Sequence, residues 1–356
     1  MTASSIATGA FSTVGEIAGR AVVMHFGDIA TEYGALRAGA MLVDRSARGR
    51  VRVTGAKAQE VITGLVTNDV AALRPGQGLY AAALNPKGKI VADLRIFALE
   101  DELLIDAPPR AQPGWLATIR KYVNPRLAPY HDASEETRDL GLFGVAARRL
   151  MAALTGIAPD TLGALPPYGH VPAEIDGRPV VVARVPDIAL EGYELILAAD
   201  AFDATWRRAV SAGAVPAGLL AWEIARIEAG YPEWGIDIDE STIPQEANFD
   251  ELHAISYTKG CYVGQEVVAR VHFRGHVNRH LRGIAGALHE PPPERAALLE
   301  ASGKQVGEVR SSGLSPRLGT VGLAMVRREV EIGTSLTAQW TGGEATVEVR
   351  ALPFPL

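Results

Sequence analysis

The sequence predicts an α+β protein of two or three domains, the last of which is a small β-barrel or sandwich. The chain has 356 residues, more than a single hydrophobic core usually serves. Segments of helical periodicity and of two-residue periodicity alternate as far as about residue 230. Beyond Arg279 helical periodicity is almost absent, and short alternating segments follow one another.

The composition is that of a globular protein from a reducing compartment. Hydrophobic residues make up 47% and charged residues 21% of the chain, which are ordinary values. The formal net charge of −6 gives no bulk attraction for nucleic acid or for an anionic membrane. Cys261 is the only cysteine, so an intramolecular disulfide is excluded. With no signal-peptide pattern and no long apolar run, we expect a cytoplasmic protein without a membrane segment.

Residues 48–139 are predicted to form one compact α+β unit. It begins with an alternating strand at 50–54 and a helix at 56–65. Two strands, 79–84 and 90–99, flank the sequence Asn-Pro-Lys-Gly at 85–88, which is typical of a tight hairpin turn. A short strand at 103–106 and a helix at 114–123 complete the unit.

The remaining elements fall before and after this unit. Residues 1–24 are expected to be a loosely held entry segment, and 30–40 a helix. Strands are predicted at 140–145, 180–185 and 193–198, and helices at 146–154, 200–212 and 218–230. Gly230 is the expected C′ residue of the last helix. Four strands are expected in the C-terminal part, at 305–310, 319–326, 335–340 and 345–350.

Two side chains have the chemistry to contact a flat heterocycle. Glu228 stands in the last helical turn, where the helix dipole disfavours a carboxylate by about 0.3–1 kcal/mol. A carboxylate accepts two parallel hydrogen bonds, so it matches the N–H edge of a pterin. It equally suits a partner for a nearby arginine. Tyr193, after the Glu191-Gly192 turn, could stack on a ring or simply cover a core edge.

The stretch Lys-Gly-Cys-Tyr-Val-Gly-Gln-Glu at 259–266 holds the single thiol. Lys259 beside Cys261, with flanking glycines, is a setting that favours the thiolate. A basic cluster follows at 270–282, which is expected to be extended. It is either a solvated strand face or a means of lowering the Cys261 pKa or of holding carboxylates. No metal site is expected, because no acidic or sulfur ligand interleaves its histidines.

Taken together, these stretches resemble the YgfZ family, which is related to the glycine-cleavage T-protein (aminomethyltransferase). The most specific likeness is the cysteine stretch, which continues through 267–270 to the Phe-Arg-Gly at 273–275. The wider T-protein scaffold is similar at 49–55, 65–70, 84–90 and 226–230.

The resemblance implies a three-domain cloverleaf around a central opening in which tetrahydrofolate or a derivative binds. Residues 1–47 with 140–250 would form the first α+β domain, which binds the folate. Residues 48–139 with 251–278 would form the second α+β domain, and 279–356 the C-terminal β-barrel.

The resemblance also implies roles for six residues. Glu228 would take the pterin and Tyr193 would line the site, with Tyr80 and Lys259 as further folate-contacting candidates. Cys261 and Asp93 are the candidates for catalysis. The chain departs from the aminomethyltransferases where those enzymes have Asp-Asp-Leu, because it reads Ala-Asp-Leu at 92–94. This departure argues against ordinary glycine cleavage.

In function, the resemblance implies an accessory protein that supports the assembly or repair of iron–sulfur enzymes, including those of tRNA methylthiolation. Its partners would be folate and those enzymes or their assembly proteins, and a monomer is the default. One alternative is a one-carbon (aminomethyl) transferase in which Asp93 orients the reacting amine or folate nitrogen through a hydrogen bond. The other is an RNA-binding factor that uses the 270–282 cluster, against which the net acidic charge counts. Whether the chain catalyses a reaction stays open at this point.

Overall fold

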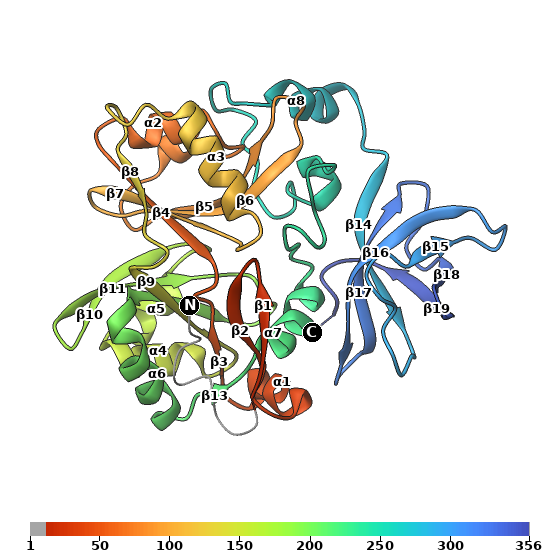
Figure 1. The fold of residues 1–356 in the computed structure, drawn as a ribbon, viewed down its shortest axis with the longest axis horizontal. Coiled ribbons are helices and arrows are strands. Elements are labelled where there is room, and N and C mark those ends of the chain that lie inside the picture. Colours follow the sequence, from red (N-terminus) through yellow and green to blue (C-terminus); the bar gives the residue numbers. More distant parts are fainter. Residues whose placement is uncertain (1–11, 356) are drawn as a thin grey trace.

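A computed structural model describes residues 12–355 as three packed units (Figure 1). The expected domain range that begins at residue 1 therefore lies partly outside the described residues. Two units are α+β and the third is a closed barrel, so the predicted fold class is confirmed. Within residues 12–355, no helix is both long and apolar enough to cross a bilayer.

The first unit is a six-stranded sheet with helices packed against it. Its strand order is β10-β11-β12-β9-β3-β13. The strands are β3 Met41–Asp44, β9 Thr137–Phe143, β10 His170–Ile175, β11 Arg178–Arg184, β12 Gly192–Ala198 and β13 Val215–Pro216. The helices are α1 Ile29–Ala38, α4 Ala147–Thr155, α5 Pro159–Ala164, α6 Phe202–Ser211 and α7 Leu219–Ala229.

The second unit is a five-stranded sheet in the order β5-β6-β7-β4-β8. Its strands are β4 Gly49–Thr54, β5 Gly78–Leu84, β6 Ile90–Ala98, β7 Glu102–Ala107 and β8 Tyr130–Asp132. Helices α2 Ala58–Thr63 and α3 Gln112–Tyr122 bury Ile62 and Trp115 against the sheet. The predicted β5–β6 hairpin is confirmed, with Gly88 at φ +71° in its turn, a conformation that costs glycine little.

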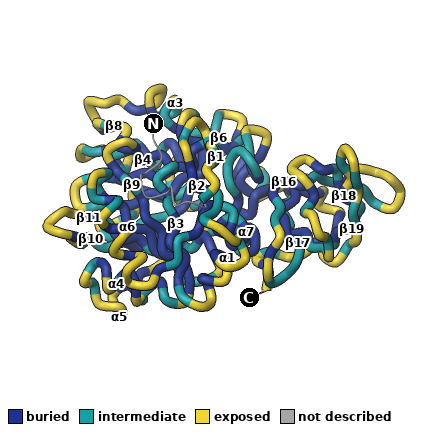
Figure 2. The backbone as a smooth tube through the Cα atoms, turned by 60° about the horizontal axis from the view of Figure 1, so that its bottom comes forward, coloured by how far each residue is buried: buried dark blue, intermediate teal, exposed yellow. Residues whose placement is uncertain are grey.

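The third unit is a barrel of six strands in the order β14-β17-β16-β15-β18-β19. The strands are β14 Arg279–Gly286, β15 Ala297–Leu299, β16 Gln305–Ser315, β17 Gly319–Arg327, β18 Ser335–Trp340 and β19 Gly343–Arg350. Closure leaves no unpaired edge. Many of the exposed residues of this unit lie in loops at the end that points away from the other two units (Figure 2).

Elements such as α5, β10 and β15 were not expected from the sequence, and two further segments have a structure different from the expected one. Part of the predicted entry segment is a hairpin, β1 Thr13–Ile17 with β2 Arg20–His25, which lies near the centre of the molecule (Figure 1). The 270–282 cluster is not extended throughout, because α8 spans Gln265–Arg274. Gly264 begins this helix at φ +81°, and a Cβ there would lie 2.6 Å from the Asn85 carbonyl oxygen. Close packing against the β5–β6 turn thus fixes the start of α8.

Candidate functional site

A cavity of about 390 Å³ lies where the β1–β2 hairpin, the first unit and the second unit meet. Its lining residues are Gly15, Glu16, Ile17, Met24, Asp44, Arg45, Ala47, Arg48, Pro109, Arg110, Leu219, Glu223, Glu233 and Ile236. They come from five separate segments of the chain, so tertiary folding alone assembles this space. We call it the central cavity.

Two arginines in the turn between β3 and β4 form one wall of the central cavity. The Arg45 guanidinium lies 3.6 Å from the ring centroid of Trp222 on α7, a cation–π contact. Its Nε is 3.5 Å from Glu194 but has no hydrogen-bond partner within residues 12–355. Arg48 donates from Nε to Asp106 of β7 at 2.6 Å. These contacts join the two sheets behind the cavity.

Asp93 and Tyr80 are brought together by the β5–β6 hairpin. The two strands pair in a register that places both side chains on one face, and the Tyr80 hydroxyl donates to Asp93 Oδ2 at 2.9 Å. Asp93 is only 4% exposed, and its Oδ1 has no hydrogen-bond partner within residues 12–355. Burial raises the pKa of Asp93 to about 6, against the opposing charge of Arg48.

Aromatic side chains surround this pair. Phe249 lies 5.2 Å from the Tyr80 ring, and Tyr168 stacks on it at 6.0 Å with an interplanar angle of 14°. Tyr231, on the loop after α7, lies 6.2 Å away. A buried carboxylate oxygen without a donor, beside flat aromatic rings, suits a heterocycle that carries N–H groups.

Glu233 borders the central cavity and is close enough to Asp93 for the two charges to interact. It follows α7 by four residues, and its side chain is partly exposed at the cavity wall. Burial and the nearby Glu223 carboxylate raise the pKa of Glu233 to about 7, and the Asp93 charge adds to this shift. Two carboxyl groups that titrate near neutrality therefore lie close together, a pattern common at functional sites.

Glu194 is a buried carboxylate that the sequence interpretation missed. It is 1% exposed and accepts from Arg95 of β6 at 2.5 Å. Arg95 also pairs with Asp187 and lies 3.5 Å from Asp106. In an alternating strand, a polar residue between Tyr193 and Leu195 faces the side opposite to both. This pattern could have identified Glu194 from the sequence.

The expected Tyr193 does not line the central cavity. It packs in the core of the first unit, on the face of β12 opposite to Glu194, and its hydroxyl donates to Glu191 at 2.8 Å. Its direction follows from strand alternation, which sends adjacent side chains to opposite faces.

The structure places Glu228 at the junction of α1, α7 and the barrel. Its carboxylate accepts from the Tyr33 hydroxyl at 2.8 Å, from the Ser315 hydroxyl at 2.6 Å and from Arg317 at 3.0 Å. Three donors of the chain already engage this carboxylate, so a pterin at this position would have to share it with them. The sequence also suggested that Glu228 pairs with an arginine, and Arg317 is such a partner.

Lys259 and Cys261 do not line the central cavity. The Lys259 ammonium donates to the carbonyl oxygens of Thr63 and Val66 and lies 4.4 Å from the Tyr262 ring centroid. Burial lowers the pKa of Lys259 to about 8. Cys261 is exposed in the loop before α8 as a free thiol. No group of three metal-ligating side chains occurs between residues 12 and 355.

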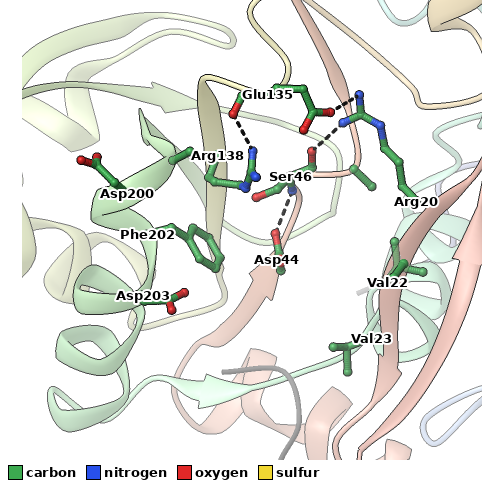
Figure 3. A pocket seen from close by; sticks show the side chains of 13 residues that line it. Arg20, Val22, Val23, Asp44, Ser46, Glu135, Arg138, Asp200, Phe202 and Asp203 are labelled. Carbon is green, nitrogen blue, oxygen red and sulfur yellow. Dashed lines mark hydrogen bonds and ion pairs between the residues drawn. The ribbon is translucent and has the colours of Figure 1, made fainter. Parts of the chain in front are cut away.

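A second cavity, of about 270 Å³, separates the β1–β2 hairpin from β3 and α6 (Figure 3). Most of the polar groups that line it already form hydrogen bonds or ion pairs within the protein. Arg20 lies 3.5 Å from Glu135 and donates to the Ser46 carbonyl oxygen, while Arg138 donates to three backbone carbonyl oxygens. Asp44 accepts from the Ser46 amide at 2.9 Å. The central cavity is therefore the better candidate site.

Comparison with known proteins agrees with this architecture. The GCVT N-terminal domain model matches residues 8–256, and the glycine cleavage T-protein C-terminal barrel domain matches 279–355. An aminomethyltransferase of Rubrobacter xylanophilus is 32% identical over 346 residues, or 96% of this chain and 89% of that protein. One of Geobacillus kaustophilus is 31% identical over 349 residues, or 95% and 93%.

A solved structure supports the fold independently. The glycine cleavage system aminomethyltransferase T of Bartonella henselae superposes with a TM-score of 0.85 over 97% of this chain and 95% of that one, at 23% identity. That identity is too low to carry more than the fold. With both domain models matched in order along nearly the whole chain, this protein belongs to the glycine cleavage T-protein family.

Proposed function

We propose that the protein binds a tetrahydrofolate beside Asp93, whose charge interacts with Glu233 in the wall of the central cavity, and moves a one-carbon unit to or from it. The observation that carries this proposal is the buried Asp93 Oδ1, which has no donor within residues 12–355 and lies among aromatic rings. The relatives named aminomethyltransferases support the same class of reaction.

The residues around Asp93 fit a reduced folate. Tyr80, Tyr168 and Phe249 offer flat apolar contact for its ring system. Tetrahydrofolate, when bound, supplies the nitrogen atoms that carry the one-carbon unit. The Asp93 carboxylate would accept an N–H hydrogen bond from the reacting nitrogen and orient it, while the Tyr80 hydroxyl holds the other carboxylate oxygen. With a pKa of about 6, Asp93 is mostly ionised at neutral pH and so is ready to accept.

Two measurements test this proposal. Calorimetric titration with 5-formyltetrahydrofolate should show binding by the wild type, and Tyr80→Phe should weaken it because the Asp93 carboxylate loses its support. Formation of methylenetetrahydrofolate from an aminomethyl donor, whose transferred carbon is already at the oxidation level of formaldehyde, should then be abolished by Asp93→Asn. Wild-type protein that neither binds the folate nor forms the product would refute the proposal.

The exposure of Cys261 favours a second candidate, the support of iron–sulfur enzymes through folate-dependent assembly or repair. The thiol is accessible on a loop held by the buried Tyr262 and by the contacts of Lys259. It can therefore meet a partner protein from the surface while a folate is bound beside Asp93. If Cys261→Ser restores the activity of client iron–sulfur enzymes as fully as the wild type does, in cells lacking the native gene, this candidate fails.

A further inference from the structure

The last two turns of α8 present an aromatic ring and two cations to solvent. Phe273 is 68% exposed, more than any other large hydrophobic side chain between residues 12 and 355. Phe273 and Arg274 follow Arg270 by three and four residues, which places all three on one side of the helix, and both arginines are exposed. Neither arginine side chain forms a hydrogen bond or an ion pair within the described residues. We call these three residues the α8 face, and α8 lies on the outside of the molecule beside the β5–β6 hairpin (Figure 1).

Neighbouring aromatic rings hold Phe273 in place. Tyr257, in the loop before α8, stacks on His272 with ring centroids 3.6 Å apart and an interplanar angle of 17°. The Phe273 ring lies roughly perpendicular to both, 4.7 Å from His272 and 6.2 Å from Tyr257. The Tyr257 hydroxyl donates to Asp250 at 2.6 Å, which anchors the stack. An ordered aromatic surface is therefore present before any partner binds, and little conformational entropy is lost in using it.

The α8 face lies in a positive segment of an acidic protein. Residues 267–282 contain four arginines and three histidines but no aspartate or glutamate, whereas the whole chain has a formal net charge of −6. Within the described chain, only Arg279 of these arginines pairs with a carboxylate, that of Glu246 at 2.9 Å. Lys87 adds an exposed cation on the β5–β6 turn, which packs against the start of α8. The unpaired cations favour an anionic partner, because a local positive potential attracts one even where the net charge is negative.

We propose that the α8 face binds single-stranded nucleic acid, with a base stacked on Phe273 and backbone phosphates at Arg270 and Arg274. A nucleotide combines a flat ring with a negative charge, and the α8 face offers a partner for each within two turns of helix. A duplex hides the faces of its bases inside the stack, so only an unpaired strand can use the ring. An acidic polypeptide would engage the arginines but would leave Phe273 without a flat partner. The proposal goes beyond the folate chemistry proposed above and does not depend on it.

The test is fluorescence anisotropy of labelled oligouridine and oligothymidine with the full-length protein across a salt series. Strands of about 12 nucleotides match the usual size of such a site. With two phosphate contacts, the logarithm of the association constant should fall against the logarithm of the salt concentration with a slope of about −1.4 or steeper. Arg270→Gln and Arg274→Gln should each weaken binding and reduce this slope by about 0.7. Phe273→Ala should weaken binding about 10-fold with the slope unchanged, because the stacked ring carries no charge.

Matched variants separate the α8 face from general effects of charge and surface. Arg126→Gln removes an exposed arginine from the loop after α3, so it changes the net charge equally. Leu127→Ala removes an exposed apolar side chain from the same loop. Each should change the affinity less than about 2-fold. Glu266→Gln should strengthen binding, since it removes the acidic side chain of α8. Urea denaturation midpoints equal to that of the wild type show that the variants are folded.

Binding of oligouridine, of oligothymidine or of both supports the proposal, and the tighter of the two identifies RNA or DNA as the ligand. Absence of binding even at low salt, where electrostatic attraction is strongest, overturns it. Phe273→Ala that binds like the wild type also overturns it. The same holds for a duplex or poly-L-glutamate bound as tightly as the single strands, because either result leaves the ring without a role. None of these measurements uses folate, so their outcome is independent of the function proposed above.

Discussion

Replacement of Glu228 by alanine distinguishes a structural carboxylate from a ligand-binding one. The wild-type side chain, 5% exposed, accepts hydrogen bonds from Tyr33, Ser315 and Arg317. Hydrogen bonds to a charged group contribute about 1.5–3 kcal/mol each. Removal of one partner of a buried ion pair costs about 3–5 kcal/mol. Arg317 is 24% exposed, so solvent screening places the expected loss near the lower end, at about 3 kcal/mol.

The assay is urea denaturation followed by tryptophan fluorescence, with 5-formyltetrahydrofolate titration alongside. Tyr33→Phe and Ser315→Ala, which each remove one donor, should lose about 1–1.5 kcal/mol. The backbone bond from the Phe354 amide to the Glu228 carbonyl oxygen, 2.8 Å long, remains in every variant. If Glu228→Ala loses less than about 1 kcal/mol and loses folate binding instead, the carboxylate contacts the ligand and the structural reasoning is refuted.

Three further predictions concern single side chains. Burial raises the folded-state pKa of Asp93 from 3.8 to about 6, so the folded state favours the protonated carboxyl. This contribution to the free energy of unfolding is complete below pH 3.8 and is lost as pH rises through 6. Asp93→Asn should therefore be more stable than the wild type at pH 8, by up to about 2–3 kcal/mol in denaturation, and equal stability at pH 8 would contradict this. Asp139 is fully buried, and desolvation together with Glu194 raises its pKa well above 3.8. Infrared spectra at pH 7 should show a protonated carboxyl band that Asp139→Asn removes, whereas an unchanged spectrum means that Asp139 is ionised. Cys261 is exposed, so it should react with a thiol reagent in the native protein, and Cys261→Ser should shift stability by less than about 0.5 kcal/mol. A thiol that reacts only after denaturation would contradict its placement.

Local sequence determined much of the secondary structure. The Asn-Pro-Lys-Gly turn sets the β5–β6 hairpin, and Gly230 ends α7 at φ +76°. The alternating segments after Arg279 close into the barrel. The hairpin turn and the end of α7 depend on residues that are neighbours in the chain, so turn chemistry was sufficient to predict them. Periodicity predicted most of the barrel strands, but their closure depends on β14 pairing with the distant β19. Asp93 and Tyr80 were likewise within reach, because one hairpin carries both.

Where each remaining carboxylate points was decided by tertiary packing alone. The sequence around Glu228 does not indicate its hydrogen-bond partners Ser315 and Arg317, because both belong to the distant barrel. The Arg110 stem lies against Gly235 only because the loop after α7 packs against a distant part of the chain. A sequence specifies which side chains are charged and which face of an element they occupy. Which partners neutralise them depends on contacts between residues far apart in the chain, and burial, which sets the pKa and the cost of each unpaired group, arises only when those contacts form.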